Sequence, residues 1–459
     1  MYTRWLGVIA ALVASVDVSL AANTTSTTSS SFINFRSVNG KLLADGETFY
    51  IKGINWFGFE TIEGAVQGLW PSATTIETAL DTLVENDFNA VRLPLALDSV
   101  INDPDVSNDQ TAGTAALAGK TYLEVLDYFV NEARKRNILV LLDSHRLEAA
   151  EPDFPDVAEP TKITPALEKL ATRYCNNPAT WNVFGIDIKN EPKGTATWGS
   201  GDEATDWRLA AATIGNAVLA KCARMLIFVE GVQTNIKGST VSWGQAGGSL
   251  QGAKDYPVKL KNMERLVYSP HVISPGVDFK SPWWTASTFP NNMAGIWDEY
   301  FGSVPTDTGN AVVVGAWGAK MTGNDLKWAN TLATYLSDNS IGSFYWAFNP
   351  QSADTGGLMM DDWKTPVEER VELLEPLPST PLDNILKKYA ESVSTVETAR
   401  TLVAWTAPDS AELSSGSSGA AILCDTCPAL VVESPAVTLV AVTPMNVFVL
   451  VLASLLVFV

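Results

Sequence analysis

Basic residues are scarce in this chain of 459 residues, which has 31 lysines and arginines against 51 aspartates and glutamates. The formal net charge of −20 argues against a nucleic-acid partner, because phosphate backbones select for basic surfaces. The four cysteines are too few for a disulfide-dense scaffold. They show no zinc-type spacing in the central region, and no cluster of ligands in the sequence argues for a metal or another cofactor. Histidine is rarer still, with only His145 and His271.

The first residues have the composition of a targeting segment. Residues 1–22 combine an early arginine, a short apolar run and a small-residue exit, which predicts a secretory signal peptide cleaved near Ala21 or Ala22. Residues 23–31 follow as a Ser/Thr-rich leader with a glycosylation acceptor at Asn23. We therefore expect a secreted, extracellular protein whose cysteines can oxidise.

The other end of the chain is apolar. Residues 437–459 are almost wholly apolar, and no charged residue follows Glu433. This pattern indicates either a lipid-anchor attachment signal or a C-terminal membrane helix, and both would tether the protein to the cell surface. Residues 391–436, rich in Ser, Ala, Val and Thr, are expected to form a low-complexity stalk, with a local disulfide between Cys424 and Cys427.

The central residues 32–390 contain eight short apolar or β-branched runs, most of them separated by segments with helical periodicity. The runs cover residues 49–54, 90–93, 138–142, 183–188, 226–229, 266–268, 311–314 and 342–345. Eight buried strands alternating with helices predict a single α/β domain, a closed (β/α)8 TIM barrel. A doubly wound open sheet is the rival fold, but no glycine-rich phosphate loop follows the first run.

Polar and aromatic residues stand where these runs end. In a barrel all strand C-termini open on one face, where active sites are built. Both histidines of the protein fall in this set, which favours a role in a site over a structural one. The set comprises Asn55, Trp56, Arg92, Asp143, His145, Arg146, Asn190, Glu191, Glu230, His271, Ala316, Trp317 and Trp346.

Two of the four cysteines precede neighbouring strands of the predicted barrel. Cys175 lies in the helix before the fourth strand, and Cys222 lies in the segment before the fifth. Because these elements are adjacent in a barrel and the chain is expected to be secreted, we predict a structural disulfide rather than two free thiols.

Seven stretches between Val38 and Leu374 together resemble glycoside hydrolase family 5, and in particular its endo-β-1,4-glucanases (cellulases). The matching stretches are residues 53–61, 89–94, 142–146, 189–192, 226–232, 266–271 and 349–357. The resemblance implies a monomeric TIM barrel that needs no metal and binds a β-glucan polysaccharide or oligosaccharide.

The resemblance also implies roles for individual residues. Glu191 stands at the position of the catalytic acid/base, and Asn190 at that of the amide that binds the sugar 2-hydroxyl. Residues expected around the sugar are Arg92, His145 and His271, with Trp346 as the aromatic platform. Tryptophans expected in the groove are Trp56, Trp70, Trp198 and Trp243, whereas Trp317 is expected to pack in the core.

Two departures from the family pattern concern the nucleophile. Where the family has a Gly-Glu-Phe/Trp-Gly run, this chain has Ala316 within the run 315–318, and the tyrosine of the family's His-x-Tyr is replaced by Ile273. Retaining cleavage needs two carboxyl groups about 5 to 5.5 Å apart. We therefore expect a pseudoenzyme with strongly impaired hydrolysis, and a double loss favours relaxed selection over an engineered change. The alternatives are a working hydrolase that uses another carboxylate and a non-catalytic binding or decoy protein.

Overall fold

The computed structural model describes residues 32–71, 73–151, 155–239, 244–383 and 385–387. The expected signal peptide, leader, stalk and C-terminal anchor lie outside these residues, as does Trp243. Within the described part, no helix combines the length and the apolar character needed to cross a membrane.

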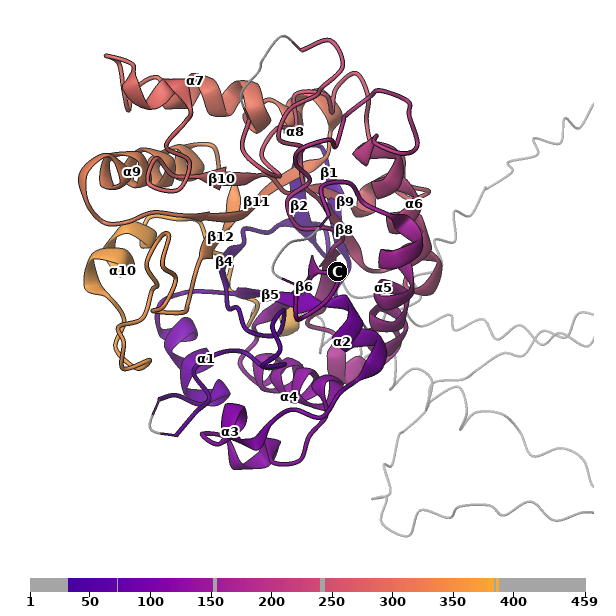
Figure 1. Ribbon diagram of the computed structural model, residues 1–459, viewed down its shortest axis with the longest axis vertical. Helices are drawn as coiled ribbons and strands as arrows, with labels where there is room; N and C mark the ends of the chain where they lie inside the picture. The colour runs from indigo at the N-terminus through magenta and orange to yellow at the C-terminus, as the bar shows by residue number, and fades with distance from the viewer. Residues whose placement is uncertain (1–31, 72, 152–154, 240–243, 384, 388–459) are drawn as a thin grey trace, which may run out of the picture. The chain divides into compact units, whose positions relative to one another are not determined.

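Parallel strands form a closed barrel at the centre of the described residues (Figure 1). The strands are β4 (Lys52–Asn55), β5 (Ala90–Ala96), β6 (Leu139–Arg146), β7 (Val183–Asp187), β8 (Leu226–Val229), β9 (Leu266–Tyr268), β10 (His271–Ile273), β11 (Ala311–Gly318) and β12 (Gly342–Trp346). The barrel closes because β12 pairs with β4. Strands β9 and β10 are two halves of one barrel strand, since β11 pairs with β9 at its start and with β10 at its end. The predicted TIM barrel is confirmed.

Helices surround the barrel and alternate with its strands (Figure 1). They are α1 (Ile76–Glu85), α2 (Leu97–Asn102), α3 (Asn108–Thr111), α4 (Tyr122–Lys135), α5 (Pro160–Cys175), α6 (Trp207–Lys221), α7 (Met293–Trp297), α8 (Val304–Thr308), α9 (Gly323–Asp338) and α10 (Glu368–Leu374). A small antiparallel sheet of β1 (Phe35–Val38), β2 (Lys41–Ala44) and β3 (Glu47–Thr48) precedes the barrel. Two of the segments with helical periodicity, residues 79–84 and 122–130, lie in α1 and α4.

The buried apolar side chains form two clusters, one inside the barrel and one between the barrel and the surrounding helices. In β6, Leu139 and Leu141 belong to one cluster with the small N-terminal sheet, whereas Val140 and Leu142 belong to the cluster that includes the helices. Because side chains alternate along a strand, the next inward residue of β6 is Asp143. The same alternation turns Arg92 inward on β5. The barrel interior is thus apolar at the N-terminal end of its strands and becomes charged one layer further along.

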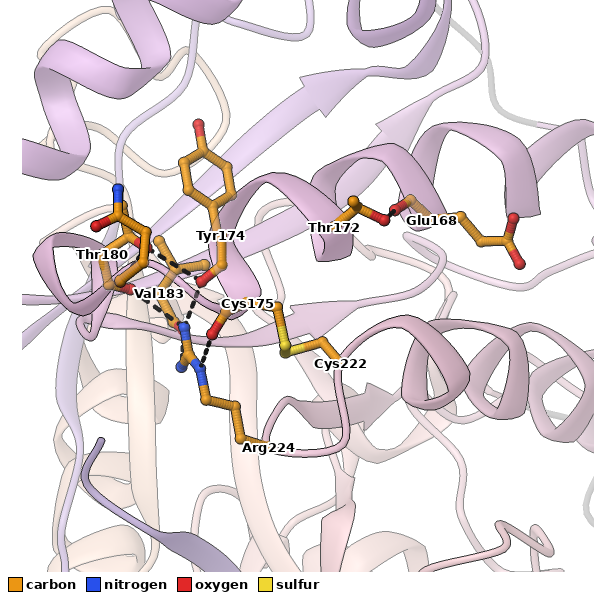
Figure 2. Close-up of a disulfide and its surroundings, with 9 residues drawn as sticks. Glu168, Thr172, Tyr174, Cys175, Thr180, Val183, Cys222 and Arg224 are labelled. Atoms are coloured by element: carbon orange, nitrogen blue, oxygen red, sulfur yellow. Dashed lines mark hydrogen bonds between the residues drawn. A yellow bond between two sulfur atoms is a disulfide. The ribbon is translucent and has the colours of Figure 1, made fainter. Parts of the chain in front are cut away.

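The predicted disulfide is confirmed, and it joins the ends of two neighbouring helices (Figure 2). Cys175 is the last residue of α5, and Cys222 directly follows α6. Next to the bond, the guanidinium of Arg224 donates to the backbone oxygens of Cys175 at 3.0 Å and of Val183 at 2.8 Å. The bond closes a loop that contains β7 and therefore ties together the two helices that flank this strand.

Candidate active site

A buried charged layer lies beneath the C-terminal mouth of the barrel. The Nη2 atom of Arg92 lies 3.0 Å from Asp143 Oδ1, 3.0 Å from Asp187 Oδ2 and 3.2 Å from Glu230 Oε1. All four side chains have 0% exposed surface. Burial lowers the pKa of Arg92, but the three carboxylates outweigh burial and raise it above its usual value. We call Arg92, Asp143, Asp187 and Glu230 the floor of the site.

The floor holds more negative than positive charge. Burial, together with the neighbouring Glu230 and Asp143, raises the pKa of Asp187 well above its usual range despite the attraction of Arg92. This shift means that the floor binds a proton more readily at Asp187 than an exposed aspartate would.

Three floor and site side chains could in principle hold a cation. Ligand atoms of Asp187, Glu230 and His271 lie within 4.8 Å of one another. However, Arg92 already donates to Asp187 Oδ2 at 3.0 Å and to Glu230 Oε1 at 3.2 Å. Its guanidinium supplies the positive charge that these carboxylates need, so the donor set fits an ion-pair network better than a metal centre.

Glu191 follows β7 and projects from the floor toward the cavity. Its backbone N–H donates to Glu230 Oε2 at 2.7 Å, and its φ of 48° lies in the left-handed region. A non-glycine residue in this region carries strain that the surrounding contacts must hold. The side chain is 35% exposed, and Oε1 lies 3.1 Å from His271 Nδ1. Burial raises the pKa of Glu191, but the hydrogen bond and charge of His271 outweigh burial, so the pKa is lowered.

His271 bridges two carboxylates. Its Nδ1 lies 3.1 Å from Glu191 Oε1, and its Nε2 lies 3.0 Å from Glu230 Oε1. Burial lowers the pKa of this imidazole, but Glu230 and Glu191 overcome that effect and raise the pKa to about 10. His271 is therefore a cation at neutral pH and the electrostatic partner of Glu191.

Aromatic rings form the opposite side of the site. The ring of Trp346 stacks on His145 at 5.8 Å with an interplanar angle of 10°, and on Phe57 at 5.6 Å and 17°. The Nδ1 atom of His145 lies 2.6 Å from Asp143 Oδ2, which orients the imidazole from the floor. Trp346 remains partly exposed and offers a flat apolar face of the kind that packs against a sugar ring.

Six of the predicted site residues line a cavity of about 280 Å³, namely His145, Asn190, Glu191, His271, Ala316 and Trp346. Its lining also includes Ile273 and Asp354. Ala316 is directly opposite His271 in the register of β10 and β11, and it is partly exposed. We call residues 271–273 and 315–318 the wall of the site. The structure thus brings residues from several strand ends together around one cavity.

Three expectations about contact with a sugar are wrong. Arg92 has 0% exposed surface and does not line the cavity, so it positions the carboxylates of the floor instead of touching a ligand. Trp56 and Trp198 are also 0% exposed. The indole N–H of Trp56 donates to Gln67 O, and its ring packs on Phe348, so Trp56 is a core residue. A strand-end position does not by itself decide whether a side chain points into the cavity or away from it.

Some site residues were missed by the sequence reasoning. Asp187 is the only charged residue of β7, and a carboxylate in an otherwise apolar strand was a usable signal. Lys189 is buried, its Nζ donates to Asn190 O at 3.1 Å, and burial lowers its pKa to about 8. Phe57 and Asp354 lie in loops without periodicity, where no such signal existed.

Comparison with known proteins identifies the family to which this chain belongs. The family described as "Cellulase (glycosyl hydrolase family 5)" matches residues 43–352. The chain belongs to glycosyl hydrolase family 5. An endoglucanase of Paenibacillus polymyxa is 35% identical over 326 residues, which cover 70% of this chain and 80% of that protein. The major extracellular endoglucanase of Xanthomonas campestris pv. campestris is 36% identical over 353 residues, covering 74% and 70%.

Solved structures of an endocellulase and an endoglucanase have the same fold. A cellotetraose complex of an endocellulase from Pyrococcus horikoshii has a TM-score of 0.68 and 33% identity, and covers 75% of this chain and 98% of that one. The catalytic domain of the Xanthomonas endoglucanase gives a TM-score of 0.67, with 33% identity and the same coverage. This chain is therefore a cellulase-like family 5 protein, and its cavity lies where the C-terminal ends of the barrel strands meet.

Proposed function

We propose that this family 5 protein binds β-1,4-glucan but is strongly impaired in hydrolysing it. The observation that carries the proposal is Ala316, which faces the same cavity as Glu191 and His271 and has no group that can attack a sugar. A retaining glycosidase forms a covalent glycosyl intermediate on a second carboxylate close to the first. Ala316 stands at the expected nucleophile position and leaves this step without a reactant.

The other carboxylates near Glu191 are poor substitutes. Asp143 and Glu230 have 0% exposed surface and are already bonded to Arg92. Glu60 is 4% exposed, accepts from the backbone of Gly58, and does not line the cavity. A carboxylate in any of these places would have to break a buried ion pair or hydrogen bond before it could reach a substrate.

The protonation state of Glu191 also argues against efficient hydrolysis. A general acid must carry its proton at the working pH, and enzymes usually raise the pKa of such a carboxyl group by placing a second carboxylate nearby. Here the pKa of Glu191 is lowered, because the hydrogen bond and charge of His271 outweigh the effect of burial. Glu191 is thus ionised at neutral pH and has no proton to give to the leaving oxygen.

The groups expected to bind a sugar are retained. Trp346 and His145 offer flat partly exposed surfaces, and Asn190 lines the cavity between them and Glu191. The carboxamide of Asn190 accepts from Arg92 Nη2 at 3.3 Å, which orients its N–H group for a ligand. The similar endocellulase that has been solved with cellotetraose supports a β-1,4-linked glucan as the ligand.

Restoring the carboxylate tests this proposal. We expect no measurable reducing-end release from carboxymethylcellulose by the native protein, and a gain of several orders of magnitude in Ala316→Glu. Ala316→Gln, which has nearly the same shape without a carboxylate, is the matched control and should stay inactive. Glu191→Gln in the Ala316→Glu background should abolish the gain. Turnover by the native protein at about 1–10³ per second, typical of enzymes, would refute the impairment.

Two alternative functions predict different results in these assays. Asp354 is an exposed carboxylate in the cavity lining, and this favours a hydrolase that uses a different second group. Activity of the native protein that disappears in Asp354→Asn would establish that alternative. If native protein and Ala316→Glu are both inactive yet bind cellotetraose in calorimetry, a non-catalytic binding or decoy protein is the better description, because Ile273 has then reshaped the wall.

We also propose that the protein is secreted and tethered outside the cell by residues 437–459. The signal-like composition of residues 1–22 and the extracellular Xanthomonas relative support secretion. Truncation after residue 436 should release the protein into the medium. Treatment with a phosphatidylinositol-specific phospholipase should release the full-length protein only if the tether is a lipid anchor, which distinguishes it from a membrane helix.

A further inference from the structure

The peptide unit between Asn190 and Glu191 has a charged hydrogen-bond partner at each end. The Nζ atom of Lys189 donates to Asn190 O at 3.1 Å, and Glu191 N donates to Glu230 Oε2 at 2.7 Å. Lys189 and Glu230 both have 0% exposed surface. A cation at the carbonyl oxygen and an anion at the N–H match the direction of the peptide dipole, and such charge-assisted bonds are stronger than neutral ones. This peptide unit is therefore held more firmly than an ordinary loop peptide.

A glycine in the loop after β8 allows Glu230 to reach this peptide unit. Gly247 has a φ of 68°, and an added Cβ atom there would lie 2.2 Å from Glu230 Oε2 and 3.3 Å from Glu191 Cα. Its N–H donates to Pro192 O at 3.2 Å, and its carbonyl oxygen accepts from His271 N at 3.3 Å. The backbone of Gly247 thus joins the segment after Glu191 to the strand of His271, and a larger side chain would push Glu230 away.

We propose that Lys189 and Gly247 are positioning residues that hold Glu191 in its left-handed conformation, with its carboxylate in the cavity. The proposal rests on the proposed function, because it assumes that Asn190 and Glu191 contact a bound glucan. It deepens that function by naming the residues that set the direction of Glu191. Neither Lys189 nor Gly247 lines the cavity, so both act through the backbone of Glu191 and not on the ligand.

The conformation of Glu191 depends on these contacts. Its φ of 48° is unfavourable for a residue with a Cβ atom, and rotation of the 190–191 peptide unit would relieve the strain. Such a rotation would break the hydrogen bonds to Lys189 and Glu230. It would also turn the side chain of Glu191 away from His271, whose Nδ1 lies 3.1 Å from Glu191 Oε1. The pair between Glu191 and His271 therefore reports on the positioning.

Titration of the histidine rings by nuclear magnetic resonance in the full-length protein tests the proposal, because the chain has only two histidines. Lys189→Met removes the cation and keeps a side chain of similar length. If Glu191 then turns away, the pKa of His271, raised to about 10 in the native protein, should fall by about one unit. Loss of a nearby positive charge without movement would raise this pKa instead. The direction of the shift thus separates positioning from a direct charge effect.

Gly247→Ala provides a second variant, in which no charge changes. The added methyl group should displace Glu230 and Glu191, so the pKa of His271 should fall here as well. Gly119→Ala is the matched control, because Gly119 has a φ of 69° and an added Cβ atom there would meet no atom within 4 Å. This control carries the same backbone strain and should leave the pKa of His271 unchanged.

Cellotetraose binding, measured by calorimetry, connects the positioning to the proposed function. We expect Lys189→Met to weaken binding about tenfold, because Asn190 and Glu191 are no longer held toward the ligand. Lys52→Met is the control, since Lys52 is also a buried lysine but lies at the start of β4, at the opposite end of the barrel. Its affinity for cellotetraose should equal that of the native protein.

Two results would contradict different parts of this reasoning. A pKa of His271 that is unchanged or raised in folded Lys189→Met, and unchanged in Gly247→Ala, would overturn the positioning and leave the proposed function standing. Native protein that binds no cellotetraose would overturn the proposed function, and the histidine titration would still decide whether Lys189 and Gly247 hold Glu191 in place.

Discussion

The floor and the wall of the site lie side by side but differ in what they contain. The floor places Arg92 among three carboxylates, all with 0% exposed surface. The wall has His271 as its only charged residue, and Ala316 stands partly exposed at its edge. Removing one partner from a buried ion-pair network leaves an uncompensated charge, whereas changing a partly exposed wall residue leaves none. A change at the wall can therefore leave the buried charges of the floor in place, as the proposed loss of hydrolysis requires.

Breaking the floor should have the largest effect. Arg92→Leu leaves three buried carboxylates without their cation, so we expect it to lower the free energy of unfolding by about 3–5 kcal/mol. Denaturant titration followed by tryptophan fluorescence measures this change. Lys162→Ala, which removes an exposed pair with Glu159, is the control and should cost less than about 1 kcal/mol. Equal effects in the two variants would contradict the contrast between buried and exposed charges.

Removing the disulfide should destabilise the barrel away from both floor and wall. The bond joins residues separated by 47 positions. Because it restricts the unfolded chain, we expect Cys175→Ser with Cys222→Ser to lower the free energy of unfolding by about 2–4 kcal/mol. Cellotetraose affinity of the folded variant should not change. A loss of affinity with unchanged stability would show that the bond acts on the site instead.

The free energy of unfolding should depend on pH through His271, a wall residue that contacts Glu230 of the floor. Its folded pKa is raised to about 10, above its value near 6.5 in an unfolded chain, so the stabilisation is fully present below pH 6.5 and is lost as pH rises through 10. The stability difference between native protein and His271→Gln should shrink by about 2 kcal/mol between pH 7 and pH 8.5.

The groups that surround His271 are Glu191, Glu230, Asp187 and Arg92, with Lys189 interacting with both glutamates. Subtracting the variant from the native protein at each pH largely removes titrations that the two share, including that of Lys189. A difference that stays constant over this range would show that His271 is neutral in the folded protein, and the charged pair with Glu191 would then be wrong.

Altering the wall should have the smallest effect. Ala316→Ser adds one hydroxyl group to a partly exposed position that faces the cavity. We expect the free energy of unfolding to change by less than about 0.5 kcal/mol. Calorimetric melting of Ala316→Ser and of Arg92→Leu under the same conditions compares the stability contributions of the wall and the floor. A loss comparable to that of Arg92→Leu would mean that the wall is as constrained as the floor.

Much of the site was predictable because strand ends in a barrel converge. The sequence runs placed Glu191 after the fourth strand and His271 after the sixth, and the barrel brings their side chains to 3.1 Å. The direction of a side chain was harder to predict. Arg92 lies one residue before the end of its predicted strand, but β5 continues to Ala96, so Arg92 lies inside the barrel and not at its rim.

Loop residues were the least predictable part. Trp198 and Trp346 are both tryptophans near strand ends, yet the indole N–H of Trp198 donates to Tyr256 O in the core, and Trp346 faces the cavity. Asp354 lines the cavity from a loop whose position no local sequence pattern predicts. Which tryptophan packs and which one faces a ligand depends on neighbours distant in the sequence.

The amino-acid sequence by itself determined the alternation of strands and helices, the set of polar residues at the strand ends, and the alanine at position 316. These are local properties, since side-chain periodicity and residue type do not depend on the rest of the chain. Only the tertiary structure decided that Arg92 is buried among carboxylates, that Glu191 pairs with a charged His271, and that Trp346 faces the cavity while Trp56 does not. Burial and charge pairing arise between segments far apart in the chain, and both exist only once the barrel has closed.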